Sequence, residues 1–127
     1  MGHVDKLKEL TTKLPSLILK EDRNLIEYES KVGSICGFGL LSEPAVAVQQ
    51  MVLSDGAIFP PHVHDREIEY GIVYKGSLNV TIDDESRTIG AGDVIKFEKG
   101  EVHSAVAEGE VRLIAVSIPR IDGYPHP

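Results

Sequence analysis

The sequence lacks several features that mark other classes of protein. Its single cysteine, Cys36, cannot form a disulfide within the chain, which fits a reducing compartment. No apolar run approaches the roughly 20 residues that cross a bilayer. The first ten residues alternate charge with leucine, where a signal peptide needs an apolar core. These absences argue against an integral membrane protein and lead us to expect a cytoplasmic location.

Positive charge is also scarce. Lys and Arg number 13 against 20 Asp and Glu, which gives a formal net charge of −7. A surface of that sign repels a phosphate backbone, and the basic residues are spread singly rather than in a dense run. Neither nucleic acid nor a membrane is therefore an expected partner. The 127 residues suffice for about one domain with one core.

The residue pattern divides the chain into three parts. Residues 1–24 are predicted to form an N-terminal helix and arm, because leucines recur there at helical spacing before Pro15. Residues 25–118 carry β-branched segments punctuated by Gly, Pro and Asp, which predicts an all-β barrel. Residues 119–127 form a tail with three prolines in nine residues, which cannot pair as a central strand.

Within the barrel, six segments are the clearest strand candidates. They are residues 46–53, 69–75, 77–82, 94–97, 102–107 and 111–118. A turn signal at Glu108 and Gly109 separates the last two. Strict alternation over 77–82 indicates a strand with two unlike faces. We expect the small or weakly polar side chains of this region to face the lumen, namely Ser77, Asn79, Thr81 and Ala105.

The residues that carry chemistry are three histidines and a carboxylate. His62 and His64 are two apart, so on a strand their imidazoles point to the same side. Glu67 and Glu69 share that parity if the strand stays regular, and His103 opens a later strand whose same-face neighbours are alanines. Gathering such groups in a lumen costs about 1–3 kcal/mol for each unsatisfied polar group. A divalent cation satisfies all four.

These residues fall on the two motifs of a known family. The first motif has a glycine, the HxH pair, a glutamate and a second glycine, and it is matched by Gly56, His62, His64, Glu69 and Gly76. The second motif is matched in spacing by Gly92, Glu98, Gly100, His103 and Ala107, with Glu98 in place of proline and Ala107 in place of asparagine. Over this region the sequence resembles the small, single-domain, metal-binding members of the cupin superfamily.

The resemblance implies a cupin-type double-stranded β-helix, or jelly-roll, barrel. It also implies one divalent metal ion per chain, held by His62, His64, Glu69 and His103. We weigh Glu69 over Glu67 because its spacing to Gly76 fits the motif. Imidazole-rich ligation with one carboxylate admits Fe, Mn, Ni, Zn or Cu. The expected function is a metal-dependent enzyme acting on a small organic molecule, with dioxygenase- or isomerase-like chemistry. The alternative is a non-catalytic module that binds a small molecule or a metal.

Two further expectations concern the faces of the sheet. Gln49 and Gln50 are adjacent, so one of them must face the lumen. Tyr70, Ile72 and Tyr74 have the opposite parity to Glu69 and would place large side chains on the outer face. Such patches usually mark an interface, and small cupins commonly pair through outer strands, so we expect a C2 homodimer. A monomer is the alternative, in which that face is covered by the tail and by the stripe Leu7, Leu10 and Leu14.

Overall fold

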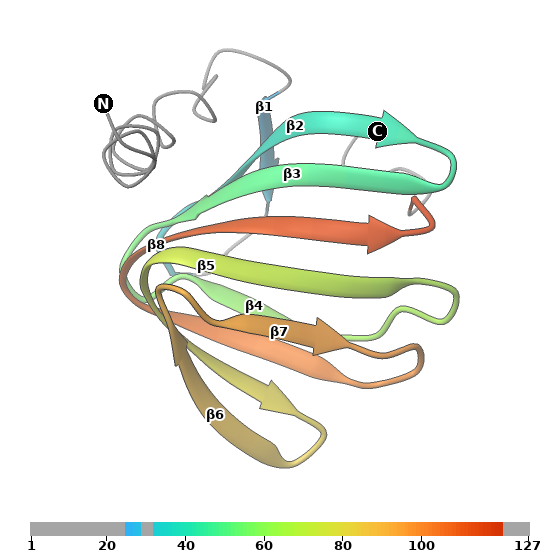
Figure 1. Cartoon of the computed structure of the whole chain (residues 1–127). Helices are drawn as coiled ribbons and strands as arrows, with labels where there is room; N and C mark the ends of the chain where they lie inside the picture. The colour runs from blue at the N-terminus through green and yellow to red at the C-terminus, as the bar shows by residue number, and fades with distance from the viewer. Residues whose placement is uncertain (1–24, 29–31, 121–127) are drawn as a thin grey trace, which may run out of the picture.

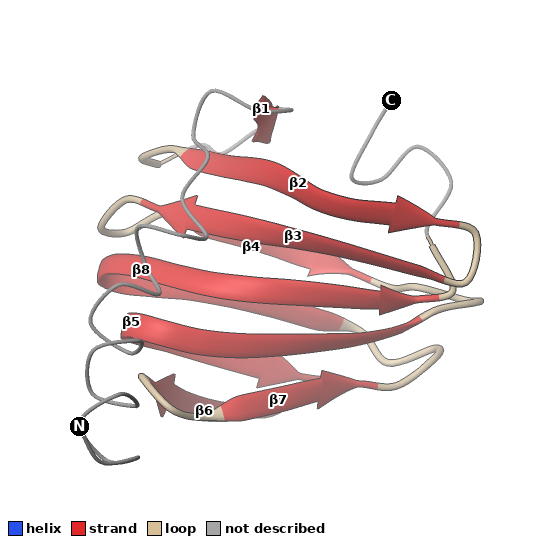
Figure 2. Ribbon diagram, turned by 45° about the horizontal axis from the view of Figure 1, so that its top comes forward, coloured by secondary structure: helices blue, strands red, loops and turns tan. Residues whose placement is uncertain are grey.

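The computed structural model describes residues 25–28 and 32–120. All the regular secondary structure in this part of the chain is β-strand (Figure 2). In chain order the strands are β1 (Leu25–Tyr28), β2 (Ile35–Glu43), β3 (Val46–Leu53), β4 (Ile58–His62), β5 (Ile68–Ile82), β6 (Glu85–Gly90), β7 (Val94–Phe97) and β8 (His103–Ile118). The predicted all-β class is confirmed. The expected N-terminal helix and tail residues 121–127 lie outside the described residues. No described helix could cross a membrane.

Two long strands, β5 and β8, run through the whole barrel. They pair antiparallel from Ile68 opposite Ile118 to Ile82 opposite His103. Both double back midway, as Figure 1 shows at one end of the molecule. One half of the pair is flanked by β3 and β7, with β2 and β1 beyond β3, and the other half is flanked by β4 and β6. This produces two facing layers of antiparallel strands.

The core lies between these two layers. Its most enclosed apolar side chains are at most 1% exposed and come from both layers: Ile35, Leu53, Ala57, Val73, Val80 and Val111. Burial of a Val, Leu or Ile side chain stabilises the fold by about 1.5–3 kcal/mol. The core therefore holds the layers together and fixes the position of the cavity between them.

The bend in β5 changes which side chains face the interior. The register with β8 shifts on both sides of Lys75, and Gly76 at this point has a φ of 80°. A Cβ at Gly76 would clash with the carbonyl oxygen of Glu110, so only glycine fits. Because a bulge inserts an extra residue, the interior side chains are odd-numbered up to Val73 and even-numbered from Leu78 onward.

This change of parity makes the lumen more apolar than the sequence suggested. Leu78 and Val80 occupy the interior and are 4% and 1% exposed. Ala105 faces the interior as predicted and is 6% exposed. The prediction that the polar residues of this segment line the lumen is wrong for Ser77, Asn79 and Thr81. The prediction assumed a regular alternation of side chains along the strand, and the bulge reverses that alternation.

The strand boundaries agree in part with the prediction. Segments 46–53 and 94–97 coincide with β3 and β7. The four other segments merge into the continuous strands β5 and β8. The prediction of a turn at Glu108 and Gly109 is therefore wrong. Gly109 has a φ of 74° and its N–H donates to Asp55 Oδ1 at 2.8 Å, so this glycine produces an irregularity within β8 instead of ending it.

Candidate metal centre

Two antiparallel strands bring His62 and His103 together. His62 is the last residue of β4, His103 is the first of β8, and the two are directly opposite in register. Their ring centroids are 4.1 Å apart. His64 follows two residues later, with its ring 5.0 Å from that of His62 and 5.4 Å from that of His103. The ligand atoms of all three lie within 4.8 Å of one another, so the group can hold a metal ion.

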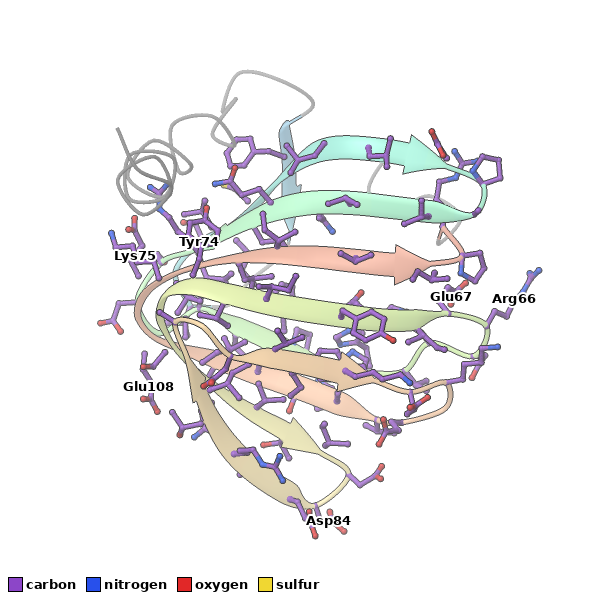
Figure 3. All side chains as sticks on the ribbon, viewed as in Figure 1. Arg66, Glu67, Tyr74, Lys75, Asp84 and Glu108 are labelled. Carbon is purple, nitrogen blue, oxygen red and sulfur yellow. The ribbon has the colours of Figure 1, made fainter. Side chains whose placement is uncertain are left out.

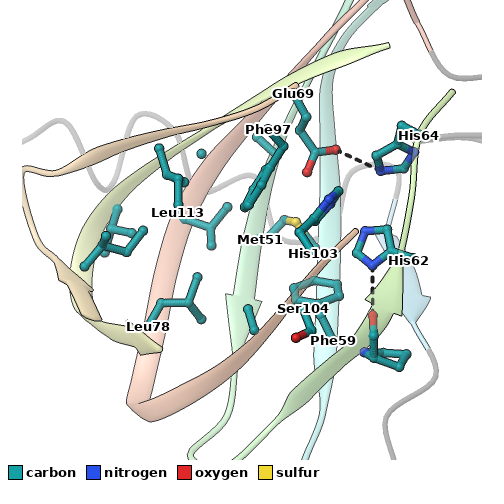
Figure 4. Close-up of a pocket in the computed structure, with 17 residues that line it drawn as sticks. Met51, Phe59, His62, His64, Glu69, Leu78, Phe97, His103, Ser104 and Leu113 are labelled. Atoms are coloured by element: carbon teal, nitrogen blue, oxygen red, sulfur yellow. Dashed lines mark hydrogen bonds and ion pairs between the residues drawn. The ribbon is translucent and has the colours of Figure 1, made fainter. Parts of the chain in front are cut away.

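Backbone carbonyl groups orient two of these rings. The Nδ1–H of His62 donates to the carbonyl oxygen of Pro60 at 2.9 Å (Figure 4). The Nδ1–H of His103 donates to the carbonyl oxygen of Glu101 at 3.1 Å. Because a carbonyl oxygen can only accept, each ring keeps its lone pair on Nε2. The Nε2 of His103 is buried and has no hydrogen-bond partner among the described residues. A cation would supply that partner, so the donor set fits a divalent metal.

A tight turn between β7 and β8 supports the other side of the site. The N–H of Gly100 donates to the carbonyl oxygen of His64 at 2.9 Å, and Gly100 has a φ of 78°. The N–H of Glu98 donates to Glu101 Oε1 at 2.6 Å. Proline, which the family motif has at position 98, has no N–H to donate. Glu98 therefore adds a hydrogen bond that anchors Glu101, the residue whose carbonyl group orients His103.

The two candidate carboxylates occupy different places. Glu69 lies on β5 and lines the cavity, with Oε2 at 3.8 Å from Nε2 of His64 (Figure 4). It stands beside the group of three histidines rather than within it. Glu67 lies next to Arg66 on the connection from β4 to β5, at the opposite end of the barrel from Lys75 (Figure 3). Glu67 does not line the cavity, so the geometry favours Glu69 as the carboxylate of the site.

Burial favours the uncharged form of the groups at this site. Burial, with His62 as the next cause, lowers the pKa of His64 and lowers that of His103 to about 4. Burial, followed by the negative charge of Glu67, raises the pKa of Glu69 to about 7. Neutral imidazoles are ready to accept a cation, whereas Glu69 must lose its proton to become a ligand.

The histidines stand at one end of a cavity of about 330 Å³. Figure 4 shows Leu78 and Leu113 away from the histidines, with Met51 and Phe97 between. Apart from the histidines, Glu69 and Ser104, the lining consists of apolar residues and one glycine: Met51, Phe59, Pro60, Gly71, Val73, Leu78, Ile89, Ile95, Phe97, Ala105, Leu113 and Ala115. The site therefore has a polar end and an apolar end.

Several lining residues had no signal in the sequence. Met51, Ile95, Phe97 and Leu113 come from β3, β7 and β8, and their position depends on pairings between segments far apart in the chain. The ring of Phe97, for example, packs on the ring of His103, and the pattern of a single strand gives no sign of this contact.

The register also decides which of the two adjacent glutamines faces inward. Gln49 is opposite Ala115, which lines the cavity, and it alternates with the lining residue Met51. Gln49 is therefore the inward-facing residue. Gln50 points to the other face, where its Nε2 donates to the hydroxyl of Tyr74 at 2.6 Å. Both glutamines are buried.

Comparison with known proteins places this geometry in a family. Residues 49–119 match the family described as the cupin domain. This match covers more than half of the chain, and the chain therefore belongs to the cupin family. The two facing layers are the jelly-roll fold that the sequence resemblance implied.

Individual relatives support the same assignment. Over 69 residues the chain is 38% identical to the pectin degradation protein KdgF of Dickeya dadantii, a match that covers 53% of this chain and 63% of that protein. The structure of KdgF from a Halomonas species has a TM-score of 0.71 at 24% identity and covers 83% of this chain and 95% of the other. A predicted oxalate decarboxylase from Thermotoga maritima has a TM-score of 0.71 at 23% identity, covering 80% and 97%. These two structures establish likeness of fold.

The sequence matches are partial. The chain spans between 30% and 63% of the length of the curated relatives that it matches. The segment that matches the family model includes the HxH segment and His103, since these lie inside residues 49–119.

Proposed function

We propose that this cupin binds one divalent metal ion through His62, His64, His103 and Glu69 and acts as a metal-dependent enzyme on a small organic molecule. The observation that carries the proposal is the convergence of three imidazoles at one end of a cavity, with the buried Nε2 of His103 lacking a hydrogen-bond partner among the described residues. Three nitrogen donors and one carboxylate suit Fe, Mn, Ni, Zn or Cu.

A bound ion of this kind acts as a Lewis acid or a redox centre, which is the basis of isomerase- or dioxygenase-like chemistry. The residues of the chain have separate tasks. The carbonyl groups of Pro60 and Glu101 hold the rings of His62 and His103 in orientation. The apolar walls keep water from the bound molecule. In the metal-free site the carboxyl group of Glu69 has a pKa of about 7, so it gives up its proton when it becomes a ligand.

The names of the relatives support a small-molecule ligand without selecting one. One refers to pectin and another to oxalate. These compounds differ in size and in the number of polar groups, and related folds host different functions. The substrate must therefore be argued from the cavity of this chain.

A second candidate function is a non-catalytic binding module. The observation that favours it is the composition of the cavity lining. Among the described residues that line the cavity, only the three histidines and Glu69 are titratable. If all four hold a metal, none is left to serve as a separate general base or as a charged anchor for substrate.

Elemental analysis and turnover assays would separate these functions. The enzyme proposal expects metal in the purified protein and, after loading with iron or manganese, oxygen consumption with catechols, diketones or thiols, or isomerisation of a substrate. Tight binding of an unreacted ligand in every such assay would favour the module. Absence of any bound metal, also after loading, would contradict both metal-dependent functions.

We also propose that a second copy of the chain is a partner. Ile72 on β5 and Val94 on β7 are opposite each other in register and are 38% and 61% exposed. Tyr70, two residues before Ile72, extends the same outer face. An exposed apolar face of this kind is the surface that a C2 homodimer would bury.

A further inference from the structure

We infer that the ligand of this site is an amphiphilic small molecule, with one metal-chelating polar head and an apolar body. The inference rests on the proposed metal function and names the substrate class that the same cavity would take. It distinguishes such a molecule from a sugar acid or a polycarboxylate, although the names of some relatives refer to pectin and oxalate.

The separation of polar and apolar groups along the cavity is the main argument. The histidines and Glu69 stand together at one end (Figure 4). Leu78 and Leu113 stand away from the histidines, and the buried lining residues Ile89 and Val73 are opposite them in register. A hydroxyl or carboxylate placed against these side chains would lose its water and gain no partner, which is unfavourable. An alkyl or aryl group placed there would be removed from water, which is favourable.

The bulge at Gly76 is what makes this end apolar. If the alternation of β5 continued without it, Ser77, Asn79 and Thr81 would face inward and could hydrogen-bond a polyhydroxylated ligand. With the bulge, Leu78 faces the cavity. The selectivity of the site for an apolar body therefore depends on a backbone irregularity distant from the histidines.

The volume of the cavity limits the size of the ligand. About 330 Å³ is at the lower end of the range for small-molecule sites. It corresponds to on the order of ten water-sized groups, since a water occupies about 30 Å³ in the liquid. A chelating head and a body of about six carbon atoms fit within this space, whereas a polymer segment does not.

Small residues create the room for the body. Ala115 on β8 lies between Gly71 on β5 and Gln49 on β3 in register, and both Ala115 and Gly71 line the cavity. A larger side chain at position 115 would occupy part of the cavity without replacing any of the histidines. Val116, the next residue, points to the outer face and offers a matched control on the same strand.

Hydroxamic acids test the inference, because one bidentate head can carry different bodies. The protein would be loaded with zinc, and the affinities of acetohydroxamate, butyrohydroxamate and hexanohydroxamate measured by calorimetry. Each added methylene should raise the affinity by up to about fourfold. Gluconohydroxamate, whose five-carbon body carries a hydroxyl group on every carbon, should bind no more tightly than acetohydroxamate. Equal affinity along the alkyl series, or tighter binding of gluconohydroxamate than of hexanohydroxamate, would overturn the inference.

Two substitutions locate the effect in the cavity. Ala115→Leu should retain zinc and acetohydroxamate but lose most of the gain from the pentyl body of hexanohydroxamate, while Val116→Leu should keep that gain. If Ala115→Leu does not fold, Gly71→Ala fills the same row from β5. Its added Cβ would lie 3.2 Å from Ile95 Cγ2, a contact that a small shift of the side chain relieves. Unchanged binding of hexanohydroxamate in a folded variant with the cavity filled would place its alkyl body elsewhere and overturn the inference.

The experiment also separates the two proposals. Retention of zinc and binding of acetohydroxamate, with no benefit from an apolar body, would overturn the amphiphilic ligand and leave the metal function standing. Failure to retain zinc would overturn both.

Discussion

The ring of Phe97 stacks on the ring of His103, with centroids 4.1 Å apart and planes inclined by 14°. Phe97 is the last residue of β7, is 8% exposed and is opposite Glu69 in register. One aromatic side chain thus lies beside both the most buried histidine of the site and its carboxylate. The stack restricts rotation of the His103 ring and keeps water from one of its faces.

Phe97→Leu should therefore weaken metal binding while the protein still folds. Leucine keeps an apolar side chain at this position, so the unfolding free energy should fall by only about 1–2 kcal/mol. Loss of the support for His103 should lower metal affinity on the order of tenfold, the low end of the range for residues that orient metal ligands. Competition with a chelator measures this. Phe38→Leu, also a buried phenylalanine but outside the cavity lining, is the control and should leave affinity unchanged.

Substitution of the proposed ligands gives the most direct test of the metal site. Replacement of His62, His64 or His103 by alanine should sharply reduce the metal content measured by elemental analysis, because each removes one of three converging nitrogen donors. Glu69→Gln should weaken binding less and should change the preference among metals, since it removes the only anionic donor.

Glu67→Gln is the matched control for Glu69→Gln. Glu67 does not line the cavity, so its replacement should change metal content little. A larger effect of Glu67→Gln than of Glu69→Gln would show that the carboxylate was misassigned by two residues. Full metal content in all three alanine variants would exclude the histidine site.

The pH dependence of stability in the metal-free protein follows from opposite pKa shifts. Folding lowers the pKa of His103 from 6.5 to about 4. The contribution of this shift to the unfolding free energy is therefore complete above pH 6.5 and is lost as the pH falls toward 4. His64 shifts in the same direction. Folding raises the pKa of Glu69 from 4.5 to about 7. The contribution of this shift to the unfolding free energy is therefore present below pH 4.5 and is lost as the pH rises through 7. Between pH 4.5 and 6.5 the two effects oppose each other.

Glu69→Gln should leave the histidines as the main source of the pH dependence of stability at this site. In this variant the unfolding free energy of the metal-free protein should rise more steeply between pH 4.5 and 6.5 than in the wild type, as measured by denaturant titrations across that range. Near pH 6, metal binding to the wild type should release about one proton, from Glu69, and the variant should not release it. Calorimetry in buffers of different ionisation enthalpy measures this release. Parallel pH profiles for the two proteins would contradict the raised pKa of Glu69.

The bulge in β5 leads us to expect different stability costs for alanine at two glycines of similar conformation. Gly76 and Gly109 have φ values of 80° and 74°, but a Cβ would clash with the Glu110 carbonyl only at Gly76. Gly109→Ala should cost about 1–2 kcal/mol from the left-handed conformation alone. Gly76→Ala should cost about 1–3 kcal/mol more, because the backbone must also move. Urea unfolding compares the two, and equal losses would contradict the steric role of Gly76.

The proposed dimer predicts a change of oligomeric state on substitution of one outer residue. Tyr70→Glu should convert dimers into monomers, because it places a charge in a face that would bury more than about 1,200 Å² in total. Light scattering at tens of micromolar measures the state. Thr88→Glu, on an exposed part of β6, is the control and should remain dimeric. A monomeric wild type would refute the dimer.

The sequence predicted the parts of the site that depend on local spacing. His62 and His64 are brought to one point by their spacing, and His103 opens β8 as expected. These predictions required only the alternation of a strand and the family motif. Metal ligation itself remains a prediction, as does the choice of Glu69 as the carboxylate.

The character of the lumen could not be predicted in the same way. Its apolar end depends on the bulge at Gly76, which reverses the alternation that the pattern of Ser77, Asn79 and Thr81 suggests. The positions of Phe97 and Leu113 relative to the histidines depend on pairings between segments far apart in the chain. Such pairings are set by tertiary packing, and a single sequence gives no register for them.

The irregular end of β4 also bears on aggregation. Among the described strands β4 pairs with β8 alone, so its other edge carries backbone groups that another chain could use for pairing. Pro60 and Pro61 interrupt that edge just before His62, and neither has an N–H to donate. The dipeptide that presents a carbonyl oxygen to the His62 ring thus also protects the barrel from intermolecular sheet growth beside the metal centre. We therefore expect replacement of these prolines to lower the solubility of the protein.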